Sequence, residues 1–245
     1  QRGLRTNTGQ CLPVNLIAQS YMDYIEENML DPAQTVGWIF DSHVACNIRV
    51  FPEQIKGIME AAGNGMEKVG VYIGNMSLSE LSMQASIETY FAHMFGGMLR
   101  RIGCKIRPYE KEKGQTDRIL AQSVTMLYNT LLGGRSKDDD LARVVGMFKK
   151  IETDPGTRPK VAIFGDLYAR DNDVFNQGLI HCIEEYGGEV ITTPFSEFAK
   201  LVASPYMRRW FLEGSFKDVI FTKTLITLVN QLEKSYYRIF NEILD

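Results

Sequence analysis

The chain has 245 residues, of which 44% are hydrophobic and 23% charged, a balance that excludes a disordered chain and allows one large or two modest folded domains. The 27 lysines and arginines are outnumbered by 30 aspartates and glutamates, which gives a formal charge of -3. The sequence therefore lacks the excess of basic residues that is typical of nucleic-acid-binding proteins. No apolar run approaches the ~20 residues needed to cross a bilayer, and none near the N-terminus could serve as a signal peptide. We therefore expect a cytoplasmic protein without a membrane partner. Because the first residue is glutamine and the last follows a helical pattern, we also expect a fragment.

Short strands alternate with helices along the sequence. Runs rich in branched residues predict buried strands at residues 35–40, 68–73, 160–164 and 189–193, with a weaker fifth at 104–108. Helical periodicity is found at residues 13–28, 52–63, 77–102, 116–132, 141–151, 174–186 and 222–244. This alternation indicates an α/β fold with mostly parallel sheets covered by helices.

A domain boundary is expected at residues 153–159, where two prolines and a glycine precede a new strand. The sequence thus predicts a first α/β subdomain with a long helical segment at residues 1–152. A second, at 160–245, would be truncated.

Several nucleotide and hydrolase motifs are absent from the sequence. It contains neither a P-loop, nor a dinucleotide-binding glycine fingerprint, nor a G-x-S-x-G elbow. The four cysteines, at positions 11, 46, 104 and 182, form no C-x-x-C pair, which excludes a zinc ribbon or a ferredoxin-type run. In a reducing compartment we expect them to be thiols or metal ligands rather than disulfides.

Two of these cysteines lie where parallel sheets collect ligands, outside the carboxyl ends of strands. Cys11 precedes the first predicted helix, and Cys46 lies in the loop that follows strand 35–40. A thiolate at a helix N-terminus is favoured by the dipole and by free N–H groups, which can also donate to cluster sulfurs. The alternative is two ordinary loop thiols. His43 could be a further ligand or could bond to the backbone, whereas Cys104 and Cys182 are most simply core thiols.

The second candidate edge follows strand 160–164, where Gly165 lets the backbone turn sharply. The polar side chains expected to gather there are Asp166, Tyr168, Arg170 and Asn176. A phosphate-like anion could sit on the helix that begins near Asp173, aided by Arg170. Alternatively, Asp171 and Asp173 merely cap that helix. The polar, turn-rich segment 107–117 could line an interdomain cleft.

Four segments, in this order, resemble the activase-related proteins of the 2-hydroxyacyl-CoA dehydratase group. They are Thr8-Gly9-Gln10-Cys11-Leu12-Pro13, Ala45-Cys46-Asn47, Gly103-Cys104-Lys105-Ile106-Arg107-Pro108-Tyr109-Glu110 and Val161-Ala162-Ile163-Phe164-Gly165-Asp166-Leu167-Tyr168. The resemblance implies two Rossmann- or flavodoxin-like subdomains flanking a cleft. It also implies a 4Fe–4S cluster held by three separated cysteines and reduced by a partner ATPase.

Within this resemblance, Cys11 and Cys46 match the two cysteines of the first subdomain, and the third family cysteine has no counterpart in the sequence. We therefore expect an iron–sulfur electron-transfer or reductase-like component that acts with an ATP-dependent activase. It could be part of a 2-hydroxyacyl-CoA dehydratase-like or acyl-CoA reductase-like system. Arg107, Tyr109 and the polar residues after strand 160–164 would contact an acyl-CoA substrate. The alternative is a non-catalytic α/β domain that binds a small molecule or a partner without a cluster; a flavin-binding domain is a further option.

Overall fold

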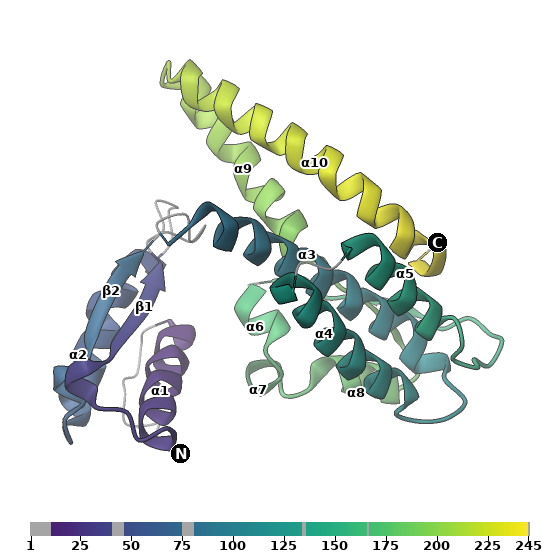
Figure 1. Ribbon diagram of the computed structural model, residues 1–245, viewed down its shortest axis with the longest axis horizontal. Coiled ribbons are helices and arrows are strands. Elements are labelled where there is room, and N and C mark those ends of the chain that lie inside the picture. Colours follow the sequence, from purple (N-terminus) through teal and green to yellow (C-terminus); the bar gives the residue numbers. More distant parts are fainter. Residues whose placement is uncertain (1–10, 41–46, 75–80, 134–135, 166, 245) are drawn as a thin grey trace. The chain divides into compact units, whose positions relative to one another are not determined.

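The computed structural model describes residues 11–40, 47–74, 81–133, 136–165 and 167–244. They belong to two compact units, unit 1 within Gln1–Ile87 and unit 2 within Glu88–Asp245. Both are mostly helical, and each contains a two-stranded parallel sheet (Figure 1). The expected α/β class is confirmed in this coarse form. Every helix in the described ranges is too short or too polar to cross a membrane.

Unit 1 contains a strand–helix–strand crossover preceded by a helix. Its elements are α1 (Leu12–Glu27), β1 (Val36–Phe40), α2 (Phe51–Ala62) and β2 (Gly70–Gly74), with 3-10 turns η2 (Pro32–Gln34), η3 (Asn47–Val50) and η4 (Met66–Lys68). β1 and β2 pair from Val36 opposite Gly70 to Phe40 opposite Gly74. The helix between them is the crossover that a parallel pair requires.

One apolar face of each helix builds the core of unit 1. On α1 the buried residues Val14, Ala18, Met22 and Ile25 recur at steps of three and four, and they pack in one cluster with Ile55, Ile58 and Met59 of α2. Tyr21 of α1 lies over Gly37 of β1, where an added Cβ would come within 2.8 Å of the ring. The missing side chain at Gly37 therefore lets α1 approach the strand closely.

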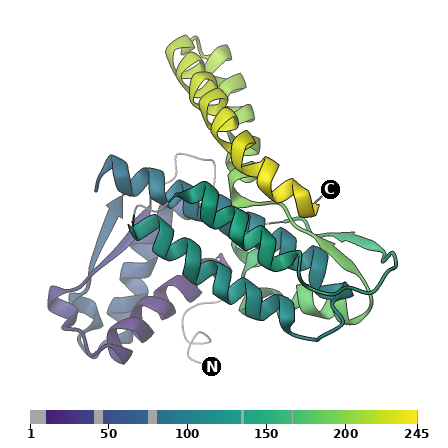
Figure 2. The same cartoon turned by 45° about the vertical axis from the view of Figure 1, so that its right-hand side comes forward.

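Unit 2 is built around the long helix α3 (Met83–Ile106), whose first five residues belong to unit 1. It continues through η5 (Arg107–Tyr109), α4 (Gln115–Gly133), α5 (Lys137–Phe148), β3 (Lys160–Ala162), α6 (Leu167–Asp171), α7 (Asp173–Asn176), α8 (Leu179–Glu185), β4 (Glu189–Ile191), α9 (Phe195–Leu212) and α10 (Phe216–Leu244). Figure 2 shows α9 and α10 side by side as a helical hairpin.

The main core of unit 2 joins three helices that are distant in sequence. Phe95, Met98 and Ile102 of α3 are almost fully buried against α5 and against Phe240 of α10. A buried carboxylate supports this packing, because Glu233 of α10 bonds to Tyr90 of α3 and to Lys200 of α9. The last turns of α10 are thus integral to the core.

The expected boundary at residues 153–159 lies inside unit 2. The amide of Asp154 donates to the carbonyl oxygen of Tyr109 at 2.8 Å, and that of Lys111 donates to the carbonyl oxygen of Glu152 at 2.9 Å. Arg158 also donates its amide to the Tyr109 hydroxyl at 3.2 Å. These bonds tie the segment to η5 and to the turn that follows it.

Three local expectations are wrong. Residues 104–108 are not a strand, since α3 continues to Ile106 and buries Cys104. The expected helix 174–186 is two helices, α7 and α8, separated by a left-handed turn at Gln177 and Gly178. The cap of α7 is neither Asp171 nor Asp173 but Asn172, whose Oδ1 accepts from two backbone amides at 3.0 and 3.2 Å.

Candidate functional site

Cys11 lies at the edge of unit 1 that the sequence analysis singled out. It is the N-cap residue of α1, it is a free, partly exposed thiol, and its carbonyl oxygen accepts from the amide of Val14 at 3.2 Å. Its side chain packs against the unit 1 core, as does that of Ile48 in η3. Cys11 and the segment after β1 therefore border the same cluster.

The direction of α1 places Cys11 at the carboxyl end of β1. The hydroxyl of Tyr21 donates to the carbonyl oxygen of Trp38, which ties the middle of the helix to the middle of the strand. From Tyr21 the helix rises about 15 Å back to Cys11, while β1 extends about 7 Å from Trp38 to its last residue, Phe40. The chain runs from the end of α1 through η2 to the start of β1, so α1 and β1 run in opposite directions. The start of α1 and the end of β1 therefore lie toward the same edge of the sheet.

The second predicted cysteine, Cys46, lies outside the described residues, as do His43 and Asp166. Among the residues that the structure describes, no three His, Cys, Asp or Glu side chains form a metal-binding group. With Cys46 outside that set, the pairing of Cys11 with Cys46 stays a prediction.

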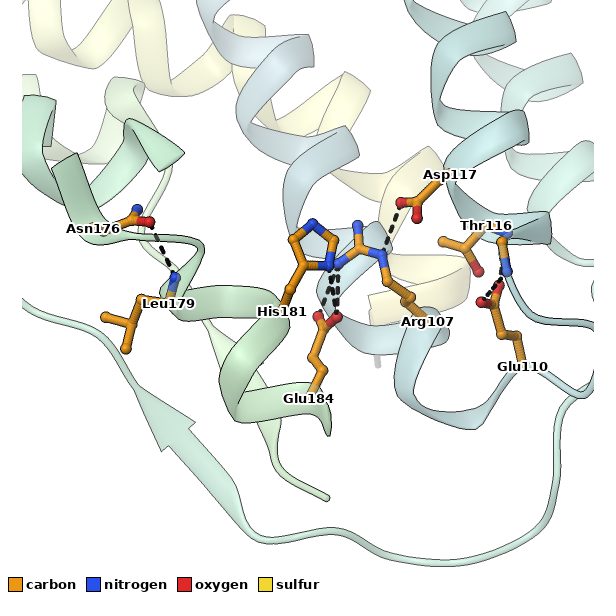
Figure 3. A network of polar contacts seen from close by, with 9 residues as sticks. Arg107, Glu110, Thr116, Asp117, Asn176, Leu179, His181 and Glu184 are labelled. Carbon is orange, nitrogen blue, oxygen red and sulfur yellow. Dashed lines mark hydrogen bonds and ion pairs between the residues drawn. The ribbon is translucent and has the colours of Figure 1, made fainter. Parts of the chain in front are cut away.

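In unit 2, Arg107 is held by carboxylates rather than presented to solvent. Its Nη1 donates to both carboxylate oxygens of Glu184 in α8 at 2.9 Å, and its Nε donates to Asp117 of α4 at 2.8 Å (Figure 3). Burial alone would lower the pKa of the guanidinium, but these partners hold the pKa above its ordinary value. His181 lies 3.9 Å from the same glutamate (Figure 3).

Two other predicted contacts serve as anchors. The Tyr109 hydroxyl donates to Glu189 at the start of β4 at 2.8 Å. The side-chain amide of Asn176 donates to the carbonyl oxygen of Arg170 at 2.7 Å, and its Oδ1 accepts from the amide of Leu179 at 3.1 Å (Figure 3). As with Arg107, the polar atoms of these side chains are engaged within the fold.

Arg170 is the most buried of those predicted site residues whose side chains the structure describes. Its side chain is 5% exposed, its Nε donates to Asp171 at 3.0 Å, and one Nη donates to the carbonyl oxygen of Thr193 at 2.7 Å. Asp171 also faces Arg100 of α3 at 3.5 Å. Tyr168 belongs to α6, but its side chain is outside the described set. The edge expected after strand 160–164 is therefore occupied by a buried arginine.

No sequence pattern indicated that residues 100–107 make contacts with segments on both sides of β4 in the chain. Arg107 bonds to Glu184 of α8, which precedes β4 in the chain. Arg100 faces Asp171. The neighbour of Asp171, Arg170, bonds to Thr193, which follows β4. Arg100 and Arg107 are thus bonded to partners more than 70 positions away in sequence.

The two described cysteines of unit 2 differ sharply in accessibility. Cys104 is 1% exposed, and burial raises the pKa of its thiol to about 11. Cys182 is exposed on α8. A buried thiol with such a high pKa is a poor metal ligand, because the thiolate is the ligating form.

The structure therefore defines a mostly helical α/β protein with two small parallel sheets. Comparison with protein-family models, curated proteins and solved structures finds no match for this chain.

Proposed function

We propose that the protein is an iron–sulfur electron-transfer component, with Cys11 and Cys46 as cluster ligands. The observation that supports this most directly is the position of Cys11, a free and partly exposed thiol at the N-terminus of a 16-residue helix. It lies at the carboxyl end of β1, where the segment containing Cys46 begins. This edge is the usual location of ligands in open parallel sheets.

The residues present fit a sulfur-ligated cluster. Cys11 is the N-cap residue of α1, so the unpaired amides of the first turn lie next to it and can donate to sulfur. The apolar cluster beneath Cys11 limits the access of water from one side. A bound 4Fe–4S cluster would supply one-electron transfer at low potential. The chain would supply two cysteine ligands, backbone amides that donate to sulfur, and an apolar cluster on one side of the site. A ligand from outside this chain would complete the coordination of the cluster.

The finer fold and the partners form part of the same proposal. A strand–helix–strand unit with parallel pairing occurs in each half of the chain, which supports two reduced Rossmann- or flavodoxin-like subdomains. By the resemblance stated above, the electron donor would be an ATP-dependent activase and the acceptor system a dehydratase or reductase acting on acyl-CoA.

Cluster loading tests this proposal. The chain is purified without oxygen and reconstituted with iron and sulfide; iron and sulfide are then quantified, and the reduced sample is measured by EPR. We expect the wild type to bind iron, and Cys11→Ser and Cys46→Ser each to lose most of it. Cys182→Ser, which removes an exposed thiol of unit 2, is the matched control and should load normally.

Circular dichroism establishes that each variant is folded. An iron-free wild type after reconstitution, or equal loading of the Cys11→Ser and Cys182→Ser variants, would overturn the proposal. The iron-free result would favour the alternative of a small-molecule or partner-binding domain.

A further inference from the structure

Unit 2 contains a hollow of about 240 Å³ at the carboxyl end of β4. One face of α3, from Ala92 to Arg100, forms one wall, and Asp171 together with residues 192–194 forms the other. All of these residues belong to unit 2, and none of them was singled out as a ligand contact by the sequence analysis. The hollow has the volume that about eight water molecules occupy in the liquid.

Two adjacent glycines explain why the hollow exists. At Gly97 an added Cβ would come within 2.7 Å of Pro194, so the missing side chain lets α3 approach the start of α9. At Gly96 an added Cβ would meet nothing within 4 Å. The close approach at Gly97 thus brings the two walls together, while Gly96 leaves the space between them unfilled.

The charged groups at this hollow carry an excess of positive charge. Asp171 is shared by two arginines, since its Oδ1 lies 3.0 Å from Nε of Arg170 and 3.5 Å from Nη1 of Arg100. Arg170 is buried, and it donates to both carboxylate oxygens of Asp171 and to the carbonyl oxygen of Thr193. The Arg100 side chain, whose Nη1 also donates to the carbonyl oxygen of Asp171 at 3.1 Å, is 27% exposed on the wall of the hollow. One carboxylate against two guanidinium groups leaves a net charge of about one.

A helix dipole adds to this positive potential. Pro194, which lines the hollow, is the N-cap residue of the 18-residue helix α9. The N-terminus of a helix presents unpaired backbone amides and about half a positive charge. Glu197 in the first turn of α9 is paired with Arg101 at 3.6 Å, so its charge is offset by a partner outside the hollow.

We propose that this hollow binds the carboxylate of a small organic acid, with Arg100 and the α9 N-terminus as the anion contacts. A planar carboxylate matches both the bidentate geometry of a guanidinium and a single excess positive charge. Ala92, Gly96 and Pro194 provide an apolar surface for a short hydrocarbon part. The volume suits a ligand of a few non-hydrogen atoms. This site is independent of the cysteines of unit 1.

The proposal is tested by titrating the whole chain with propionate in buffer free of carboxylate and phosphate. Binding is followed by the amide chemical shifts of Thr192 and Thr193, which line the hollow. Propionamide, which has nearly the same shape but no charge, is the first comparison, and inorganic phosphate is the second. We expect saturable binding of propionate in the millimolar range and at least tenfold weaker binding of both alternatives.

Two variants address the site itself. Arg100→Gln removes the exposed cation and should weaken propionate binding at least tenfold. Gly96→Leu fills the hollow from a helical position with open space and should abolish binding. Gly57→Leu, at an exposed helical glycine of unit 1 that also has open space, is the control and should bind like the wild type.

Failure of propionate to bind, preferential binding of phosphate, or unchanged binding by Gly96→Leu would each overturn the assignment. Because Gly96→Leu leaves every charge in place, it remains informative even if Arg100→Gln disturbs the contact with Asp171. Cluster loading by Cys11 and Cys46 is measured separately, so the failure of one proposal is distinguishable from the failure of the other.

Discussion

Replacement of Arg107 by methionine is expected to destabilise unit 2 strongly. The variant leaves Glu184, whose side chain is 6% exposed, without the two 2.9 Å bonds that compensate its charge. Loss of one partner of a buried ion pair costs about 3–5 kcal/mol. The bond to Asp117 adds little, because that carboxylate is 52% exposed and such pairs contribute about 0–1 kcal/mol. The loss at Glu184 therefore dominates.

Fluorescence can follow this loss in unit 2 alone. The chain has two tryptophans, Trp38 in unit 1 and Trp210 in α9, so a Trp38→Phe background leaves a single reporter in unit 2. In urea, with a dependence of about 1–3 kcal/mol per molar denaturant, the Arg107→Met midpoint should fall by on the order of 2 M.

The double variant Arg107→Met/Glu184→Met is the internal control. With the pair replaced by two apolar side chains, no buried charge is left uncompensated, and most of the lost stability should return. A single variant within 0.5 kcal/mol of the background would refute the structural role of the pair. That result would instead suit the sequence-based prediction that Arg107 contacts an acyl-CoA substrate, since a residue kept for substrate contributes little to the stability of the free chain.

Three further variants test local features of unit 2. The buried Glu110 accepts from the amides of Gly114 and Thr116, both at 2.7 Å; burial alone would raise its pKa, but these bonds lower it below the ordinary value. Glu110→Gln should therefore lower the free energy of unfolding by about 1–3 kcal/mol at neutral pH. Urea titrations at several pH values should show this difference shrinking once the pH falls below about 4 and through the depressed folded-state pKa, because the wild-type carboxylate is then protonated. A difference that grows in acid would contradict this. Gly97→Ala should lower the thermal midpoint of unit 2 despite the better helix propensity of alanine, because its Cβ would lie 2.7 Å from Pro194. Gly96→Ala, at a position with open space, should raise the midpoint or leave it unchanged. Equal midpoints for the two variants would contradict the close approach at Gly97.

The elements that were predictable from the sequence are those specified by local patterns. Both strands of unit 1 and helices α1, α2 and α4 agree with the expected ranges within about two residues at each end, because branched runs and helical periodicity are properties of neighbouring residues. Gly187, with a φ of +88°, follows Tyr186, the C-cap residue of α8, at the position where a left-handed glycine commonly ends a helix.

The failures have a common physical origin in contacts between distant residues. The segment 104–108 resembles a short strand, yet burial of Cys104 and Ile106 by packing of α3 overrides that preference. Helix α9 was not predicted, and it carries Pro205 in its interior, where proline ordinarily ends a helix. The partner of Arg107, Glu184, is 77 positions away and no local pattern identifies it.

The same long-range contacts change how arginines in this sequence should be interpreted. The sequence predicts Arg107 and Arg170 as ligand contacts, but Arg107 joins η5 to α8 and Arg170 joins α6 to the segment after β4. Arg100, the arginine left partly exposed at the hollow of unit 2, is then the better candidate for an anion contact.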